Sequence, residues 1–347
     1  MKSRQGLVVA AFLAVLALVV FANRGSIHFD WGMFFTQLRH VSWARIAAGI
    51  ALIYATFWFR AVRWSVFLAP ATKVRSSVLV GPQFIGFTAV ALFGRLADLT
   101  RPYLVARRID LPVSSQVAVY TIERMFDLGA AAIIFSGALV FAPAGLPHRE
   151  VFVHTGEISL AGTAFLAVFA IMVRVAGGAV AKALRAMLGR LSAPMAESVA
   201  DKILGFRDGL NAISSAQDFV VVTLLSLAMW GLIGEAYVQT AHAFVATPEL
   251  AGLTYSRTML LMAASIGGSL LQLPIIGWFT QIAITAGAMH AFYGAPIEAS
   301  TACGALLLIV TFLSIIPAGL VFARVGRVSL KKVAAESSAE ASTEAAT

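Results

Sequence analysis

The chain has 347 residues, of which 59% are hydrophobic and only 12% are charged, and its mean hydropathy is +0.86. This composition excludes an ordinary soluble globular protein, because the apolar residues fall into repeated runs that are long enough to cross a bilayer. The net charge of +9 lies in short segments between those runs, which predicts contact with anionic lipid headgroups and no nucleic-acid partner.

Nine apolar runs follow one another along the chain, and a helical bilayer crossing needs roughly 20 such residues. The first run follows Lys2 and Arg4 and has no small-residue cleavage site behind it, so we expect an uncleaved first helix. The runs cover about 7–22, 43–69, 77–97, 114–142, 157–173, 219–244, 256–273, 275–293 and 299–323.

Two stretches contain residues that interrupt helices. The stretch 77–97 contains Gly81-Pro82, Gly86 and Gly94, and the stretch 256–293 contains Gly267-Gly268, Pro274 and Gly277. This pattern is typical of broken or re-entrant transmembrane helices. The sequence therefore predicts an all-α integral membrane protein, a polytopic helical bundle with about six full spans and two broken or re-entrant helical hairpins.

The basic residues predict the orientation through the positive-inside rule. They cluster at the N-terminus, in 60–108, in 174–207 and in 324–332, so we expect these segments and both termini on the cytoplasmic side of the plasma (inner) membrane. Eight of them flank the 77–97 run on both sides, which predicts a hairpin that enters and leaves by the cytoplasmic face. The 256–293 stretch is expected to form a second hairpin from the outer face, or alternatively two full crossings.

The order of these elements predicts an inverted repeat within one transmembrane domain at 1–332, with halves at about 1–145 and 155–325. In such folds, broken helices meet near the bilayer midplane and can hold a polar or anionic group. Residues 178–214 predict amphipathic helices on the cytoplasmic surface, either as a packed connector or in a regulatory role. Residues 333–347 contain few large apolar side chains and are expected to be disordered.

Three clusters of ionisable residues lie at or near membrane depth, where each costs about 3 kcal/mol unless it is paired or lines a wet cavity. The first cluster is Arg60 and Arg63, one helical turn apart at the end of the second run and followed by Trp64. These two arginines can bind one phosphate together. Alternatively, their side chains snorkel to the membrane interface and only fix the orientation of the helix.

The second cluster lies within Gly94–Leu104, at the exit of the first predicted hairpin. Asp98 can neutralise either Arg95 or Arg101, each three residues away, and Pro102 limits the preceding helix. One arginine is then left unmatched. An unmatched guanidinium beside a broken helix predicts an anion site, with a purely structural role as the alternative.

The third cluster is Glu123, Arg124 and Asp127, early in the 114–142 run, with a net charge of −1. Glu123 and Asp127 share a helix face, and Arg124 can reach Asp127. This cluster either complements the spare arginine of the second cluster or titrates during transport. At the interruption of the second hairpin, the candidate substrate contacts are Gln272, Pro274 and Gly277.

Several classes of chemistry are excluded by the sequence. It contains no Walker loop, dinucleotide fingerprint, serine-hydrolase elbow or zinc-protease motif. His148 and His154 lie in a predicted outer loop without a carboxylate arrangement that specifies a metal. We therefore expect no cofactor, no metal site and no catalytic residue.

Taken together, these motifs resemble the lysylphosphatidylglycerol synthase transmembrane-region, or flippase-like, family over nearly the whole chain. The family typically has a glycine-arginine-x-glycine-glutamate-x-x-arginine-proline stretch, and here Ala97 and Asp98 stand where glycine and glutamate are usual. The late glycine-rich turn of the family usually ends in glutamate, whereas this chain has Gln281. The acid of the first motif is thus kept but shortened, and that of the second is replaced by a neutral amide.

The resemblance implies a protein that moves or handles an amphiphilic lipid, such as an aminoacylated phospholipid or a polyprenyl-linked sugar, between leaflets. Full-length synthases of this group carry a separate cytosolic aminoacyl-transferase domain, and we expect no synthase activity from this chain. The first hypothesis is therefore a carrier that binds an anionic membrane lipid. The alternatives are an embedded enzyme that modifies a lipid headgroup with Glu123 or Asp127 as base, and a non-transporting partner subunit of a lipid- or glycan-synthesising enzyme.

Overall fold

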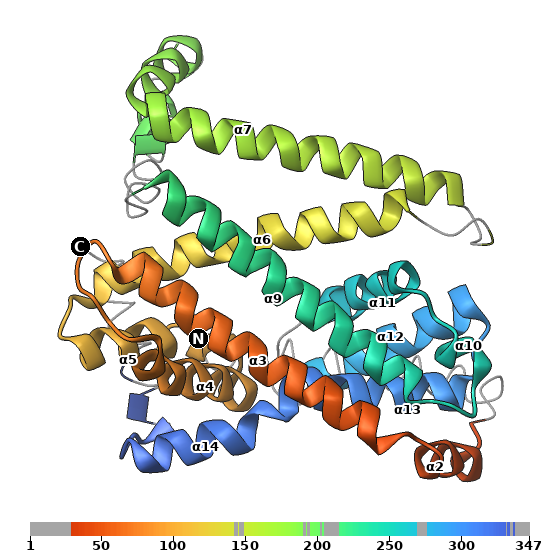
Figure 1. Ribbon diagram of the computed structural model, residues 1–347. Helices are drawn as coiled ribbons and strands as arrows, with labels where there is room; N and C mark the ends of the chain where they lie inside the picture. The colour runs from red at the N-terminus through yellow and green to blue at the C-terminus, as the bar shows by residue number, and fades with distance from the viewer. Residues whose placement is uncertain are drawn as a thin grey trace, which may run out of the picture.

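The computed structural model describes residues 29–141, 145, 149–189, 192, 195–201, 203–204, 215–268, 276–330, 332–333 and 336. Within these residues the secondary structure is helical, with no strand, as the sequence predicts. The first predicted helix, at 7–22, lies outside the described residues. Figure 1 shows long helices crossing the molecule side by side, with α7 (Arg149–Leu188) along one edge.

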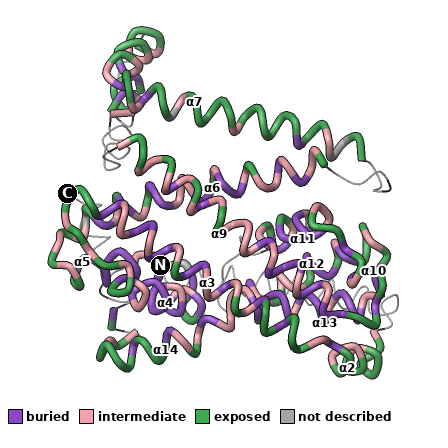
Figure 2. The backbone as a smooth tube through the Cα atoms, in the orientation of Figure 1, coloured by how far each residue is buried: buried purple, intermediate pink, exposed green. Residues whose placement is uncertain are grey.

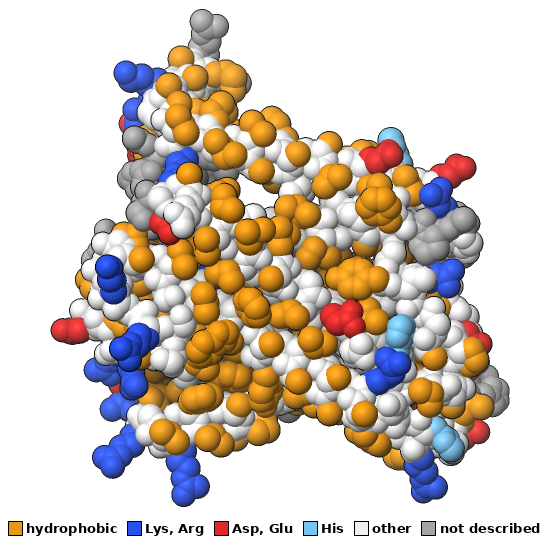
Figure 3. Space-filling model, viewed as in Figure 1, with side chains coloured by type: hydrophobic (Ala, Val, Ile, Leu, Met, Phe, Trp, Pro, Cys, Tyr) orange, Lys and Arg blue, Asp and Glu red, His pale blue; other side chains and the backbone are white. Residues whose placement is uncertain are grey.

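Four helical segments are long and apolar enough to cross a membrane, and the bent pair Val153–Phe169 and Ile171–Leu188 within α7 would make a fifth. The prediction of a polytopic α-helical membrane protein is confirmed, and the number of six full spans stays a prediction. The distribution of side chains on the surface agrees with this assignment. Figure 3 shows apolar groups over the middle of the visible face and basic groups gathered towards its edges. The four segments are Trp43–Leu68, Ser76–Phe93, Ala216–His242 and Ile297–Val325.

The centre of the bundle is an antiparallel pair of helices, α3 (Trp43–Leu68) and α9 (Ala216–His242). At one end, the Ser42 amide donates to the Ala243 carbonyl over 2.8 Å. Towards the other end, Arg63 donates to the Ser226 hydroxyl over 2.7 Å. Figure 2 shows that the buried backbone is concentrated around these central helices, whereas α7 is mostly exposed, as expected for a helix that faces lipid.

The first predicted hairpin is present but its break is elsewhere. Helix α4 (Ser76–Phe93) runs unbroken through Pro82, and the chain turns at Gly94, whose φ is 74°. Pro82 is tolerated because the carbonyl that loses its partner belongs to Val78, which is in the first turn and exposed. The prediction that Gly81-Pro82 and Gly86 interrupt the helix is therefore wrong.

After Gly94 the chain forms a short 3₁₀ turn, η1 (Gly94–Ala97), and then α5 (Thr100–Ile109) runs back along α4. A Cβ atom on Gly86 would lie 2.6 Å from the Arg101 Cβ, so a glycine is required where the two arms touch. Further along, Ser77 and Arg108 line one pocket, which places both ends of the hairpin together. The returning arm is thus α5, beyond the 77–97 run that was predicted to contain the whole hairpin.

The second hairpin consists of α11 (Tyr255–Gly268) and α12 (Ile276–Tyr293). At its open end the Tyr293 hydroxyl donates to the Arg257 carbonyl over 2.8 Å, and nearer the turn Gln281 donates to the Ser265 hydroxyl over 2.8 Å. The residues between the two helices lie outside the described part of the chain, and the choice between a re-entrant hairpin and two full crossings stays a prediction.

The last span is interrupted, although its sequence predicts an ordinary helix at 299–323. Helix α13 (Ile297–Leu308) passes through a π-helical turn, η2 (Ile309–Leu313), into α14 (Ile315–Val325), and the Ser314 amide donates to the Ile309 carbonyl over 2.7 Å. Pro317 explains the wide turn, because a proline lacks the amide donor and its ring displaces the carbonyl four residues earlier.

Side chains of the first half satisfy the backbone beside this interruption. The Tyr54 hydroxyl donates to the Ser314 carbonyl over 2.6 Å, and the Thr88 hydroxyl donates to the Ile315 carbonyl over 3.4 Å. Backbone groups inside a bilayer need such partners, because water is not available there. The irregular turn is therefore held in place by α3 and α4.

The packing of the two halves is related. In the first hairpin, α4 packs on α14 and α5 packs on α6 (Val113–Val140). In the second hairpin, α11 packs on α6 and α12 packs on α13. Each hairpin thus contacts the last span of its own half and that of the other half. An inverted repeat produces this pattern, while the limits of the two halves at 1–145 and 155–325 stay predictions.

The connecting segments differ in detail from the sequence prediction. The sequence predicts a span followed by separate surface helices from residue 178. In the structure a single helix, α7, continues from Arg149 to Leu188 and contains one non-helical residue, Ala176. Arg185 pairs with Glu197 over 2.9 Å, which ties the end of α7 to the following segment. Two short helices, α2 (Trp31–Arg39) and α10 (Pro248–Ala251), lie at the end of the bundle opposite the first hairpin's open end.

The C-terminal segment begins inside the bundle. Val333 is buried against Ile85, Tyr103 and Leu104, and Glu336 accepts a hydrogen bond from the Tyr103 hydroxyl over 2.8 Å. These contacts belong to the first residues of the segment predicted to be disordered. The rest of that segment lies outside the described residues.

One close contact between the halves gives a stability prediction. A Cβ atom on Gly319 of α14 would overlap Thr88 and lie 2.8 Å from the Phe84 carbonyl of α4. Gly319→Ala is therefore expected to lower the free energy of unfolding by about 1–3 kcal/mol through overpacking, measured from the unfolding midpoint in detergent. Gly129→Ala is the control, since a Cβ there has open space. Equal stability of the two variants would contradict this packing.

Candidate functional site

A network of buried charges lies between the first hairpin and the central helices. Its charged members come from α3, α5 and α6, and neutral members are added by α4 and α9. Five of the charged residues are at most 7% exposed. The charged members are Arg60, Arg63, Arg101, Glu123, Arg124 and Asp127, and the neutral ones are Gln83 and Ser226.

Arg63 is the centre of the network and is fully buried. Its Nη2 donates to Glu123 Oε1 over 2.6 Å, and its Nη1 donates to Asp127 Oδ1 over 2.7 Å. The same Nη1 donates to the Ser226 hydroxyl over 2.7 Å, which in turn donates to the Val222 carbonyl. One planar guanidinium thus links α3 to both α6 and α9, a geometry that lysine cannot reproduce.

Arg101 brings the returning arm of the hairpin into the network. Its Nη1 donates to Glu123 Oε1 over 3.0 Å, and its Nη2 forms an ion pair with Glu123 Oε2 at 2.7 Å. Nη1 also donates to Gln83 Oε1 over 3.0 Å. Three aromatic rings surround this guanidinium at 5.0 to 5.6 Å from their centroids, those of Trp64, Phe87 and Tyr120.

Arg60 makes longer ion-pair contacts than Arg63 and Arg101, and Arg124 is more exposed than the other arginines of the network. Arg60 Nη1 lies 3.4 Å from Asp127 Oδ2 and 3.5 Å from Glu123 Oε1, both longer than a good charged hydrogen bond. Arg124 lies 2.9 Å from Asp127, and its side chain is 38% exposed. Arg60 is therefore the buried arginine with the most capacity for a further partner, and Arg124 lies at the rim of the network.

The charges of this network do not balance. Its described members carry four guanidiniums and two carboxylates, an excess of two positive charges that is reduced by the nearby carboxylate of Asp98, which interacts electrostatically with Arg124. Among the described residues, five buried donor atoms of the network have no hydrogen-bond acceptor, namely Arg60 Nε, Arg63 Nε, Gln83 Nε2 and the Nε and Nη2 of Arg124, and one acceptor, Glu123 Oε2, has no hydrogen-bond donor. Buried charges and donors without partners are costly. The arrangement is therefore chemically complementary to an anionic group that can accept several hydrogen bonds.

The structure brings together most of the predicted site residues. The first and third clusters form one network, and the reading in which Glu123 complements the spare arginine is correct, with Arg101 as that arginine. Asp98 was predicted to neutralise either Arg95 or Arg101; Arg101 pairs with Glu123 instead, and the side chain of Arg95 lies outside the described residues. Asp98 makes no ion pair with any side chain that the structure describes, because it lies in the turn between η1 and α5 and not on the helix face of Arg101.

The other predicted residues do not join the network. The side chain of Arg95 is outside the described part of the chain, and so are the whole residues Gln272 and Pro274. Gly277 is buried in α12, a helix that contributes no described contact to the network. Within the described part of the chain, five buried charged residues gather where α5 of the first hairpin meets α3 and α6, and Glu298 at the start of α13 is a separate buried carboxylate, whereas a midplane site shared by both hairpins was predicted.

Two residues of the network were missed by sequence reasoning, Gln83 and Ser226. Each is a polar residue in a largely apolar helix, and both are at most 1% exposed. The sequence signal for Gln83 was its amide in the middle of the 77–97 run, where an unpaired polar group is costly. Ser226 gave no comparable signal, since a serine can bond to its own helix, as it also does here.

The fold and the buried network define a multi-pass α-helical membrane protein with a cationic site inside the bundle. The chain belongs to the lysylphosphatidylglycerol synthase TM region family, whose profile matches residues 6–327. It is also similar to the glycosyltransferase AglD of Haloferax volcanii, with 28% identity over 252 residues, or 65% of this chain and 39% of that protein. The chain thus spans less than half of that relative's length. No solved structure matches the chain.

Proposed function

We propose that this protein binds an anionic amphiphilic lipid, a phospholipid or a polyprenyl-linked lipid, and moves it between leaflets. The observation that carries the proposal is the excess of two positive charges in the buried network. A lipid phosphate supplies negative charge and several acceptor oxygens, which are what Arg60, Arg63 and Gln83 lack. Membership of a lipid-synthase membrane-region family supports a lipid ligand over a soluble anion.

The position of the network suits a lipid headgroup. Arg60 lies eight residues before the end of α3 at Leu68, which places it about 12 Å below that end of the helix. Arg124 at the rim is partly exposed, whereas Arg60 and Arg101 are closed in. A headgroup would therefore meet Arg124 first and reach the deeper arginines when the hairpin moves relative to the spans, as alternating access requires.

The alternative of an embedded headgroup-modifying enzyme has less support. A general base needs a carboxylate that is free to take a proton. Glu123 and Asp127 are each held by two or more guanidiniums, which stabilises their charged forms. We therefore propose no catalytic role for either residue.

A role beside a glycan-synthesising enzyme has one specific support. The similar protein from Haloferax volcanii is named a glycosyltransferase, and this chain matches only 39% of it. Such a relationship is expected when a membrane part presents or moves the lipid on which another part acts. In this second candidate the same network binds the lipid, and a separate enzyme modifies it.

The test is leaflet exchange of labelled lipids in vesicles that contain the purified protein. Arg60→Gln is expected to remain folded, because its ion pairs are long, and to slow exchange of an anionic phospholipid about tenfold through loss of one charged hydrogen bond. The matched control is Arg185→Gln in the connecting segment, which removes the same charge far from the network. Exchange by the parent no faster than in empty vesicles, across phospholipid and polyprenyl-phosphate probes, would refute the proposal.

A further inference from the structure

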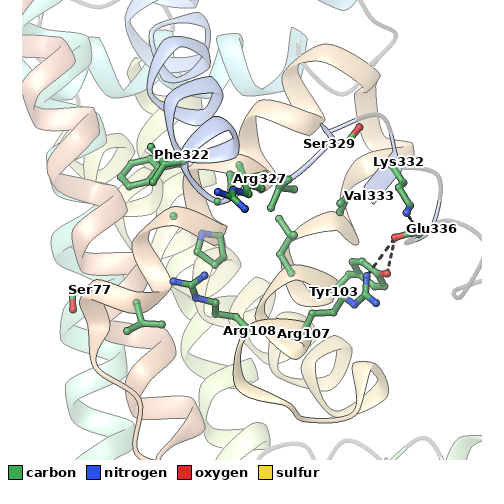
Figure 4. Close-up of a pocket in the computed structure, with 18 residues that line it drawn as sticks. Ser77, Tyr103, Arg107, Arg108, Phe322, Arg327, Ser329, Lys332, Val333 and Glu336 are labelled. Atoms are coloured by element: carbon green, nitrogen blue, oxygen red, sulfur yellow. Dashed lines mark hydrogen bonds and ion pairs between the residues drawn. The ribbon is translucent and has the colours of Figure 1, made fainter.

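A second cationic feature lies on the other side of the first hairpin. A pocket of about 510 Å³ opens between α4, α5, the end of α14 and the segment that follows it. Ligand pockets in proteins typically measure about 300–1,000 Å³, so this one has room for a phosphate with its adjoining glycerol. Figure 4 shows the pocket with its basic residues around the opening.

The lining of the pocket has two chemical parts. Four basic side chains contribute to it, and Glu336 is its one acidic residue among those described, which leaves three positive charges in excess. The remainder of the wall is largely apolar and includes Pro82, Ile85 and Phe322. This combination matches an amphiphile with an anionic head. The basic residues are Arg107, Arg108, Arg327 and Lys332.

The backbone at one of these arginines supports a built site. Arg327 follows the end of α14 with a φ of 53°, in the left-handed region where helix ends favour glycine. The turn is closed by the Val328 amide, which donates to the Ala323 carbonyl over 2.8 Å. A non-glycine residue in this conformation costs about 1 kcal/mol, and such a cost is expected where the side chain is needed.

A carboxylate of the chain itself occupies part of this pocket. Glu336 accepts from the Tyr103 hydroxyl over 2.8 Å and lies 3.8 Å from both Arg107 and Lys332. These are the groups that a phosphate would engage at the same position. Arg108 and Arg327 take no part in these contacts with Glu336 and line the other part of the same pocket (Figure 4).

We propose that this pocket is a second binding site for the phosphate of an anionic phospholipid, and that Glu336 competes with the phosphate for it. The choice of a lipid as ligand rests on the proposed function. The pocket is separate from the buried network, since Tyr103 and Arg101 lie two positions apart on α5 and contact different partners. A lipid that displaces Glu336 would release the C-terminal segment from the hairpin that carries Arg101.

The experiment places a fluorescent reporter at the rim of the pocket. Ser329 lines the pocket and is exposed, and the chain's one cysteine, Cys303, is buried, so Ser329→Cys in a Cys303→Ala background accepts a single environment-sensitive label. The labelled protein in phosphatidylcholine nanodiscs is titrated with phosphatidylglycerol, and separately with inorganic phosphate. We expect a saturable signal with phosphatidylglycerol.

The variants decide the outcome. Arg108→Gln with Arg327→Gln is expected to weaken the apparent affinity by about tenfold or more, at roughly fivefold for each basic residue. Glu336→Gln is expected to strengthen it severalfold, and Arg39→Gln on α2, at the opposite end of the bundle, to leave it unchanged. A stronger response to inorganic phosphate than to phosphatidylglycerol would support the phosphate site and identify a soluble ligand.

Two results would overturn this inference without touching the proposed function. One is an equal affinity of the parent and the double arginine variant. The other is an affinity that Glu336→Gln leaves unchanged or weakens. Leaflet exchange is measured on the same variants, so that failure of the pocket and failure of transport are seen separately.

Discussion

Glu123→Gln is expected to lower the free energy of unfolding by about 3–5 kcal/mol, the cost of removing one partner from a buried ion pair. Glu123 is fully buried and lies 2.6 Å from Arg63 and 2.7 Å from Arg101, with Arg60 at 3.5 Å. Its neutralisation leaves four guanidiniums with one carboxylate and raises the excess positive charge from two to three. The measurement is the unfolding midpoint of the protein in detergent.

The control for this prediction is a carboxylate on the surface of the protein, outside the network. Glu157→Gln is expected to change stability by less than about 0.5 kcal/mol, because the Glu157 side chain is 60% exposed. The double variant Glu123→Gln with Arg101→Gln should recover part of the loss, since it removes a charge of each sign. If Glu123→Gln is as stable as Glu157→Gln, the network does not hold these helices together.

The spans could be predicted from sequence because their signal is local. A run of about 20 apolar residues is sufficient to indicate a membrane helix, and α3, α9 and the last span all follow their runs. The breaks within helices depend on position in the fold. Pro82 leaves α4 intact because it comes early in the helix, whereas Pro317 follows a π turn beside which the Tyr54 and Thr88 hydroxyls donate to the Ser314 and Ile315 carbonyls.

The ionisable clusters were also visible in sequence, but most of their partners were not. Spacing of three or four residues predicts contacts only where both residues lie on one helix. It succeeded for Arg124 and Asp127, which are both in α6, and failed for Asp98 and Arg101, which a turn separates. The pairing of Arg63 with Glu123 spans 60 positions and requires the packed bundle.

Arg101→Gln is expected to slow leaflet exchange of an anionic phospholipid by about 10- to 100-fold, the equivalent of one strong charged hydrogen bond. The variant should remain folded, because Glu123 keeps its contact with Arg63 at 2.6 Å. Its effect on exchange is expected to be large because Arg101 is the charged residue that the first hairpin contributes to the network, where it carries one of the excess positive charges. The measurements are exchange in vesicles and the unfolding midpoint of the same preparation.

Arg101→Lys separates charge from geometry at this position. Lysine keeps the positive charge but cannot form the paired contact with Glu123 or bridge to Gln83, so it should recover only part of the exchange rate. Arg45→Lys is the matched control, because Arg45 also donates to a glutamine, Gln239, at the far end of α3. A folded Arg101→Gln that exchanges lipid at the parent's rate would mean that the network serves only to join the helices.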